Sequence, residues 1–93
     1  MSQVHAGARP RAAARCAWQA VEGEAVVIDL ETRRVLGLNR TGSLVWSRMD
    51  GRRTVAELSQ DVAAAFQVAP ETASRDVEAF LAPLVARGLV ELA

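Results

Sequence analysis

Residues 35–46 read Val-Leu-Gly-Leu-Asn-Arg-Thr-Gly-Ser-Leu-Val-Trp, and the hydrophobic period changes inside this stretch. The first four residues, Val35 to Leu38, predict a short strand. Asn39 and Thr41 are both candidate caps for a helix over residues 41–49. Four residues of that helix recur at i, i+3, i+4 and i+7 and share one face: Gly42, Val45, Trp46 and Met49. The stretch therefore predicts the junction between a β half and an α half.

Upstream of this junction the chain predicts two more strands. Ala17 to Val21 is followed by Glu22-Gly23, a dipeptide typical of hairpin turns. Ala25 to Leu30 is the second strand, and a polar turn over residues 31–33 leads to the third. In the second strand Val26, Ile28 and Leu30 share one face. The other face, with Ala25, Val27 and Asp29, is expected to be only partly exposed to solvent.

Downstream of the junction the chain predicts two more helices. Thr54 and Glu57 form a capping box, and Pro70 suits the first turn of the last helix. Arg87 and Gly88 indicate its end. The apolar stripes are Val55, Leu58, Val62 and Phe66 on one helix, and Ala73, Val77, Phe80, Leu81, Leu84 and Val85 on the other. Leu89 to Leu92 is a brief extended tail that is able to return to the sheet.

The order of the elements predicts an α+β, winged-helix-like domain, with a three-stranded antiparallel sheet followed by three helices. With 93 residues, half of them apolar, the chain is expected to form one domain with a modest core. Residues 1–15 show no periodicity and contain Gly7 and Pro10. We therefore expect a disordered basic arm over residues 1–15 and a domain over residues 16–93.

The charge distribution argues against a nucleic-acid partner. All basic residues are arginines, and three of them lie in the acid-free first fifteen residues. Residues 16–93 carry eight arginines against eleven acids, a net charge of −3. No apolar run is long enough to span a membrane. The lone Cys16 allows no intrachain disulfide and favours a reducing, cytoplasmic compartment.

Residues with catalytic or metal-binding chemistry are few. His5 is the only histidine and Cys16 the only cysteine, so they cannot supply the roughly four ligands of a zinc site. No phosphate-binding glycine loop, dinucleotide fingerprint or nucleophile elbow is present. Asp50 and Asp61 are interpreted as a turn residue and a solvated helix face. We expect no enzymatic activity, no cofactor and no metal.

Several segments in order resemble the pyrroloquinoline quinone biosynthesis protein D family. They are Leu38-Asn39-Arg40-Thr41-Gly42, then Val45-Trp46, then Asp50-Gly51-Arg52-Arg53-Thr54-Val55, then Asp76-Val77-Glu78-Ala79-Phe80-Leu81 and Leu84-Val85-Ala86-Arg87-Gly88-Leu89-Val90. The resemblance spans about residues 17–92. One departure is Val27-Ile28-Asp29-Leu30-Glu31, where the quinone-cofactor members carry a leucine-rich strand that ends in proline-glutamate. This departure favours a stand-alone module of another peptide pathway, such as a lasso-peptide or radical-enzyme cluster.

The resemblance implies a recognition element for ribosomally made, post-translationally modified peptides. Such an element binds the leader of a precursor peptide and presents the core to a modifying enzyme, often a radical S-adenosylmethionine enzyme. In related modules the leader adds as an antiparallel strand to the third strand, in a groove bounded by the third helix. An unpaired strand edge suits this mode, because an extended peptide satisfies its free N–H and C=O groups.

We expect peptide-binding residues on both sides of this groove. On the strand side they are Arg34, Val35, Leu36, Gly37 and Leu38, and on the helix side Asp76, Val77, Phe80, Pro83 and Leu84. Pro83 removes a hydrogen bond inside a helix, either to shape the groove wall or to let the helix curve round a small core. Gly37 is either a bulge or a site of close backbone approach.

Alternatives come from other classes. A winged helix often places a recognition helix in DNA, but the predicted third helix is net acidic. The arginines Arg33, Arg34, Arg52 and Arg53 are either solvated or meet an acidic leader or a partner enzyme. A structural subunit that docks on an enzyme without touching the peptide is a further alternative. The unpaired edge is compatible with a monomer or a weak dimer.

Overall fold

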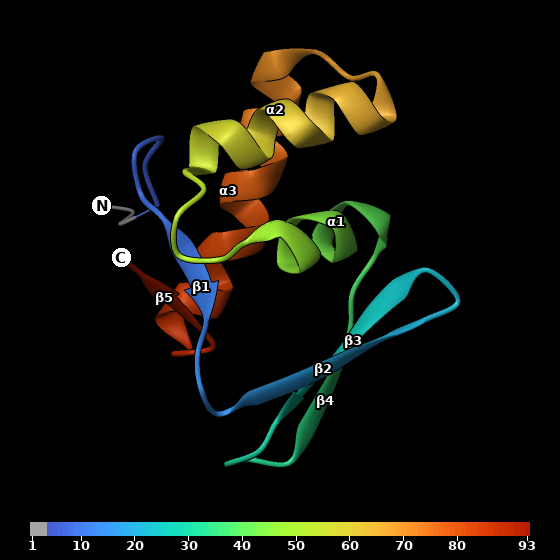
Figure 1. The fold of residues 1–93 in the computed structure, drawn as a ribbon, viewed down its shortest axis with the longest axis vertical. Helices are drawn as coiled ribbons and strands as arrows, with labels where there is room; N and C mark the ends of the chain where they lie inside the picture. Colours follow the sequence, from blue (N-terminus) through green and yellow to red (C-terminus); the bar gives the residue numbers. More distant parts are fainter. Residues whose placement is uncertain (1–3) are drawn as a thin grey trace.

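The computed structural model describes residues 4–93. In chain order its elements are β1 (Pro10–Ala12), β2 (Cys16–Val21), β3 (Glu24–Asp29), β4 (Arg34–Gly37), α1 (Arg40–Arg48), α2 (Val55–Phe66), α3 (Pro70–Ala86) and β5 (Val90–Leu92). The strands β2, β3 and β4 form an antiparallel sheet in that order, and the three helices lie together on one side of it (Figure 1). The predicted class, a three-stranded sheet followed by three helices, is confirmed.

The helix boundaries follow the caps that the sequence predicted. Asn39 caps α1, and its side chain accepts a hydrogen bond from the N–H of Gly42. Thr54 and Glu57 form the predicted capping box at the start of α2, with both reciprocal hydrogen bonds present. Pro70 begins α3, and Gly88 follows its end with φ of 75°, a conformation that favours glycine. These local signals place each helix within a residue or two of its predicted position.

The face of β3 that the helices cover is the opposite of the one that its large aliphatic side chains suggested. Ala25, Val27 and Asp29 are buried, whereas Ile28 and Leu30 are exposed. Ala25 is small enough for α1 to approach the sheet, and its N–H donates to the Ser43 hydroxyl at 2.8 Å. The Asp29 carboxylate accepts hydrogen bonds from Thr32 and Arg15, which satisfy a charge in a buried position. Apolar size alone was therefore a misleading guide to the covered face.

The core fills the space between the inner face of the sheet and the three helices. Trp46 is 2% exposed and lies in this core, as the sequence predicted. Its other buried apolar members come from every layer of the fold: Val4, Ala8, Ala25, Val27, Val45, Met49, Val55, Leu58, Val62, Ala73, Val77, Leu81, Leu84, Leu89 and Val90.

Residues 4–15 belong to the fold, where the sequence predicted a disordered arm. β1 pairs with β5 in antiparallel register, so the last strand joins a separate two-stranded sheet and does not return to the sheet of β2, β3 and β4. The carbonyls of Ala8 and Ala6 accept the N–H groups of Val55 and Ala56 at 2.8 and 3.0 Å. These two donors lie in the first turn of α2 and have no partner inside the helix. Residues 4–15 thus supply hydrogen-bond acceptors for the start of α2. Such contacts do not require a periodic hydrophobic pattern in the segment, so the sequence pattern did not reveal them. The predicted arm also includes residues 1–3, which lie outside the described residues.

Arg15 ties this segment to both the sheet and α3. Its guanidinium donates to Asp29 at 3.1 Å, to Glu31 at 3.3 Å and to the carbonyl of Arg87 at 3.0 Å. The Arg87 carbonyl lies at the end of α3, where backbone acceptors lack intrahelical donors. Within residues 4–93 no helix is long and apolar enough to cross a membrane.

Candidate functional site

The strand β4 presents a backbone edge that no other strand in residues 4–93 covers. The N–H of Leu38 donates to the carbonyl of Ala25 at 2.9 Å, so Leu38 turns its backbone toward β3. Because the hydrogen-bonding direction alternates along an antiparallel strand, Val35 and Gly37 turn their N–H and C=O groups toward the free edge. This edge is therefore able to accept an additional strand.

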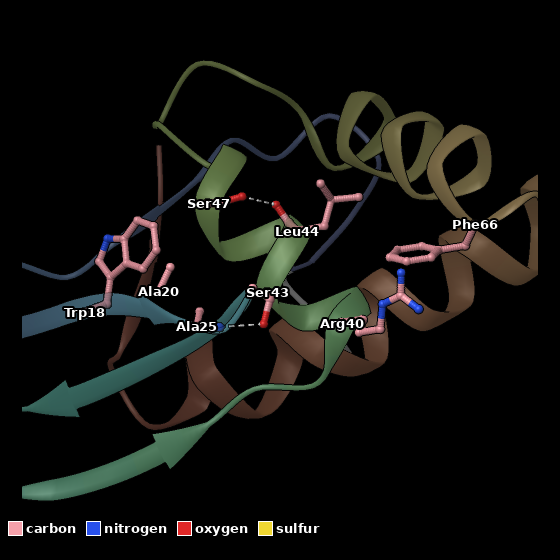
Figure 2. A pocket seen from close by; sticks show the side chains of 9 residues that line it. Trp18, Ala20, Ala25, Arg40, Ser43, Leu44, Ser47 and Phe66 are labelled. Carbon is pink, nitrogen blue, oxygen red and sulfur yellow. Dashed lines mark hydrogen bonds between the residues drawn. The ribbon is translucent and has the colours of Figure 1, made fainter.

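Ser43 fixes the position of this edge relative to the helices. Its hydroxyl accepts the N–H of Ala25 and donates to the carbonyl of Leu38 at 3.3 Å. The hydroxyl takes the place of one backbone hydrogen bond between β3 and β4. It does so at the point where β4 leaves the sheet and the chain continues into α1. Figure 2 shows the bond from Ala25 to Ser43. The side chain thus anchors α1 to the end of the sheet.

A hollow of about 390 Å³ lies between the start of α1 and one face of α3. Its lining combines a short polar rim with an aromatic wall: Asn39, Thr41, Gly42, Asp76, Ala79 and Phe80. Because β4 leads directly into Asn39, the free edge and the hollow are consecutive along the chain. We define the β4 edge and these six residues together as the candidate groove.

The groove carries opposite charges near its two ends. Arg34 begins β4, and its side chain forms no ion pair within residues 4–93. Asp76 lines the hollow and likewise has no ion-pair partner in the described chain. The guanidinium and the carboxylate are therefore both available for pairing with charges of opposite sign.

The structure brings together some of the sequence-predicted residues and separates others. Asp76 and Phe80 reach the hollow, whereas Val77 and Leu84 are buried in the core. Pro83 is exposed inside α3 and does not line the hollow. On the strand side, Arg34, Val35 and Gly37 are exposed, while Leu36 and Leu38 pack partly against the core.

Gly37 has open space beside it and forms no bulge. Its register with Val26 continues that of the neighbouring pair Leu36 and Val27 without an inserted residue. A β-carbon at Gly37 would meet no atom within 4 Å. The glycine thus leaves room beside the free edge.

Four residues of the hollow were not predicted as binding residues: Asn39, Thr41, Gly42 and Ala79. Asn39 and Thr41 were interpreted as helix caps and Gly42 as part of a helical face. A glycine inside a helix costs stability relative to alanine, and this cost is the one signal that could have indicated a special role for Gly42.

A second hollow of about 380 Å³ lies on another side of α1, against β2 and β3. Figure 2 shows Trp18 and Ala20 on the sheet at one end and Arg40 beside Phe66 at the other. The Arg40 guanidinium lies 5.6 Å from the centre of the Phe66 ring, within the range of a cation–π contact. This hollow shares no residue with the groove.

The acidic side chains considered for catalysis are occupied by structural contacts. Asp50 accepts the N–H groups of Arg52 and Arg53, and these two bonds lower the pKa of its carboxyl. Asp61 pairs with Arg48 and Arg53. Asp50 therefore stabilises the turn before α2, and Asp61 links α2 to Arg48 and Arg53.

The thiol of Cys16 is not activated for nucleophilic attack. Burial raises its pKa, and the nearby Asp29 charge raises it further against the opposing effect of Arg15. The thiol Sγ donates to the Leu89 carbonyl at 3.6 Å. In the described part of the chain, no group of three or more His, Cys, Asp or Glu side chains is arranged to hold a metal ion.

Residues 24–90 match the family described as coenzyme PQQ synthesis protein D. Three solved structures share the fold. TbiB1 in complex with the TbiA(beta) leader peptide has a TM-score of 0.79 and 26% identity, and the match covers 87% of this chain and 94% of that one. A lasso peptide synthetase B1 complexed with its leader peptide has a TM-score of 0.78 and 20% identity, with coverage of 89% and 98%.

The third is the solution NMR structure of the PqqD truncation of Methylobacterium extorquens PqqCD, a stand-alone recognition element for ribosomally synthesised and modified peptides. It has a TM-score of 0.72 and 24% identity, with coverage of 88% of this chain and 87% of that one. No curated protein matches this sequence.

Proposed function

This chain belongs to the family of coenzyme PQQ synthesis protein D, and we propose that it binds the leader of a ribosomally made precursor peptide. The leader adds as an antiparallel strand to β4, and the module presents the rest of the precursor to a peptide-modifying enzyme. TbiB1, which is 26% identical over most of both chains, was solved with a leader peptide bound, and this likeness supports the proposal.

The observation that carries the proposal is the free edge of β4 beside the hollow of α1 and α3. Val35 and Gly37 offer backbone groups for strand pairing, which supplies affinity for any extended peptide. The hollow then receives one side chain of the leader between Asp76 and Phe80. Backbone pairing and side-chain selection thus come from two adjacent parts of one groove.

We assign the sequence-predicted residues to different tasks in this complex. Arg34, Val35, Gly37, Asp76 and Phe80 contact the leader directly. The others position these contacts: Leu36 and Leu38 hold β4 on the core, Val77 and Leu84 hold α3, and Pro83 sets the shape of its last turns. Asn39, Thr41, Gly42 and Ala79 complete the lining.

In this proposal the module has no catalytic activity of its own and acts through the modifying enzyme. That enzyme is a lasso-peptide protease or synthetase, or a radical S-adenosylmethionine enzyme. The site of action is the cytoplasm, where the ribosome releases precursor peptides. The lone Cys16, which leaves the fold without a disulfide, suits that reducing compartment.

The experiment that tests the proposal is an NMR titration of the isotope-labelled protein with the leader of a candidate precursor from its own gene cluster. We expect the largest shifts in residues 34–38 and 76–84. The same leader in scrambled order is the control for sequence choice.

Shifts that remain scattered, or equal shifts with the scrambled peptide, would contradict the proposal. Salt-sensitive shifts with duplex DNA would instead favour the winged-helix alternative. Within its bounds α3 carries three carboxylates, Glu71, Asp76 and Glu78, against the single guanidinium of Arg75. This charge opposes phosphate binding, so the structure supports no DNA-binding role for α3.

A further inference from the structure

The sheet has an apolar face that nothing in residues 4–93 covers. Period-2 alternation and the strand register place five aliphatic side chains on the face opposite the helices: Val21, Val26, Ile28, Leu30 and Val35. We call these five residues the outer face. Four of them are strongly exposed, Val35 by 62%, Leu30 by 58%, Val21 by 47% and Ile28 by 37%. The solvent face of an antiparallel sheet is normally polar, so this composition indicates a binding surface.

Charges of opposite sign flank the two ends of the outer face. Glu22 and Glu24 lie at the end of the sheet where β2 turns into β3. Arg33 lies at the opposite end, in the turn between β3 and β4, where the charge of Glu31 is paired with Arg15. Glu22, Glu24 and Arg33 are exposed, and none of the three forms an ion pair within residues 4–93. Along the strands, the outer face is therefore acidic at one end and basic at the other.

We propose that the outer face binds the same face of a second copy of this chain in a two-fold dimer. A two-fold axis that lies between the sheets and runs across the strands reverses the strand direction. The acidic end of one copy then lies over the basic end of its partner, and the five aliphatic side chains of each copy pack against one another. A surface that is self-complementary in both charge and apolarity fits a second copy better than a partner of uniform charge.

The dimer is weak because the outer face is small. Two strands of six residues and one of four cover roughly 20 Å by 10 Å. This area is well below the ~800 Å² that each partner of a stable complex usually buries. The contact is made by the face of the sheet and leaves the edge of β4 free. Val35 takes part in both contacts, through its side chain in the dimer and through its backbone groups in the leader complex. Arg33 and Glu24 lie outside the leader groove, so charge reversals at these positions test the dimer separately from leader binding.

Sedimentation velocity from micromolar to millimolar concentration tests the dimer, with charge reversals at its two ends. Arg33→Glu alone places acid over acid, and Glu24→Arg alone places base over base. We expect each variant to self-associate roughly fivefold or more weakly than the unmodified chain, because two ion pairs become two repulsions. An equimolar mixture of the two variants restores both pairs, so association returns in the mixture alone.

Two further variants guard against a general effect on folding or charge. Leu30→Ser removes apolar surface from an exposed position and weakens association without unfolding the chain. Arg75→Glu reverses a charge on α3, away from the outer face, and leaves association unchanged. A wild-type chain that remains monomeric at millimolar concentration would overturn the proposal. So would a mixture of Arg33→Glu and Glu24→Arg that associates no better than either variant alone.

Discussion

Gly42 and Phe80 pack so closely that a β-carbon on Gly42 would lie 2.8 Å from Cε1 of the Phe80 ring. The same atom would lie 3.2 Å from Oδ1 of Asn39, which accepts the N–H of Gly42 and caps α1. One glycine thus allows the first turn of α1 and the middle of α3 to meet at the proposed leader groove. The close approach sets the spacing of the two walls of the hollow.

We expect Gly42→Ala to lower the free energy of unfolding by about 1–3 kcal/mol, because the added methyl group forces the Phe80 ring out of its position. Urea unfolding measures this change. Gly37→Ala is the matched control, since the added β-carbon at Gly37 meets nothing within 4 Å. An equal loss of stability in both variants would contradict the close approach of Gly42 and Phe80.

Gly37→Pro tests strand addition to β4. The N–H of Gly37 points to the free edge, so proline removes a donor that the leader needs and leaves the bonds between β3 and β4 intact. We expect leader affinity, measured by fluorescence polarisation, to fall by about fivefold or more, the equivalent of roughly one hydrogen bond. Gly37→Ala keeps the N–H and should retain affinity. Unchanged binding by the proline variant would exclude this edge as the site.

Asp76 is expected to select a basic side chain in the leader. Its carboxylate lines the hollow beside Asn39 and has no ion-pair partner in residues 4–93. A leader with lysine at the position that enters the hollow should bind more tightly than the same leader with glutamate there. Asp76→Lys should reverse this order, as expected for a direct charge contact. Calorimetry with the four combinations of protein and peptide measures the coupling, and an order that stays the same would place Asp76 outside the contact.

Arg15 and Arg11 provide a matched pair of arginines in the same N-terminal segment. The exposed Arg11 pairs with Glu91 at 3.1 Å, and both side chains are more than half exposed, so Arg11→Ala should have almost no effect on stability. Arg15→Ala leaves the buried Asp29 carboxylate without its guanidinium and the Arg87 carbonyl without a donor. We expect a clearly lower urea midpoint for Arg15→Ala alone. Equal midpoints would indicate that residues 4–15 contribute little to the fold.

Acid should destabilise the protein through three carboxylates. Burial acts to raise the pKa of Asp29, but the Thr32 hydroxyl, backbone N–H groups and the Arg15 charge outweigh it and lower the pKa below its ordinary value of 3.8. Hydrogen bonds from backbone N–H groups also lower the pKa of Asp50, and Thr54 lowers that of Glu57 below 4.5. Groups of this kind stabilise the fold above their unfolded pKa, and the stability is lost as the pH falls through the lower, folded pKa.

Thermal unfolding from neutral pH down to pH of about 2 measures this loss, which should begin near pH 4. Asp29→Asn keeps hydrogen-bonding capacity but cannot titrate, so its stability should depend less on pH over this range. A melting temperature that is flat across the acid range would contradict the three lowered pKa values.

The sequence by itself determined the local elements of this protein. The caps at Asn39 and Thr54, the prolyl start of α3 and the stop at Gly88 each satisfy or end a helix through neighbours within a few residues. Such signals act over short distances, so they are visible without the fold. The same holds for the order of three strands and three helices, and for the motifs that carry the family resemblance. That resemblance predicts β4 as the strand to which a leader adds.

Only the tertiary structure decided which faces and segments meet. Residues 4–15 bind the start of α2 and the strand β5, which are more than forty residues away in each case. Contacts between such distant segments do not produce a periodic hydrophobic pattern in the sequence. Which face of β3 is covered depends on how closely α1 approaches the sheet. The small Ala25 lets α1 come close enough for the Ala25 N–H to bond the Ser43 hydroxyl, whereas the larger Ile28 and Leu30 would keep the helix farther away. The hollow between Gly42 and Phe80 likewise arises from two helices whose contact depends on the packing of the whole core.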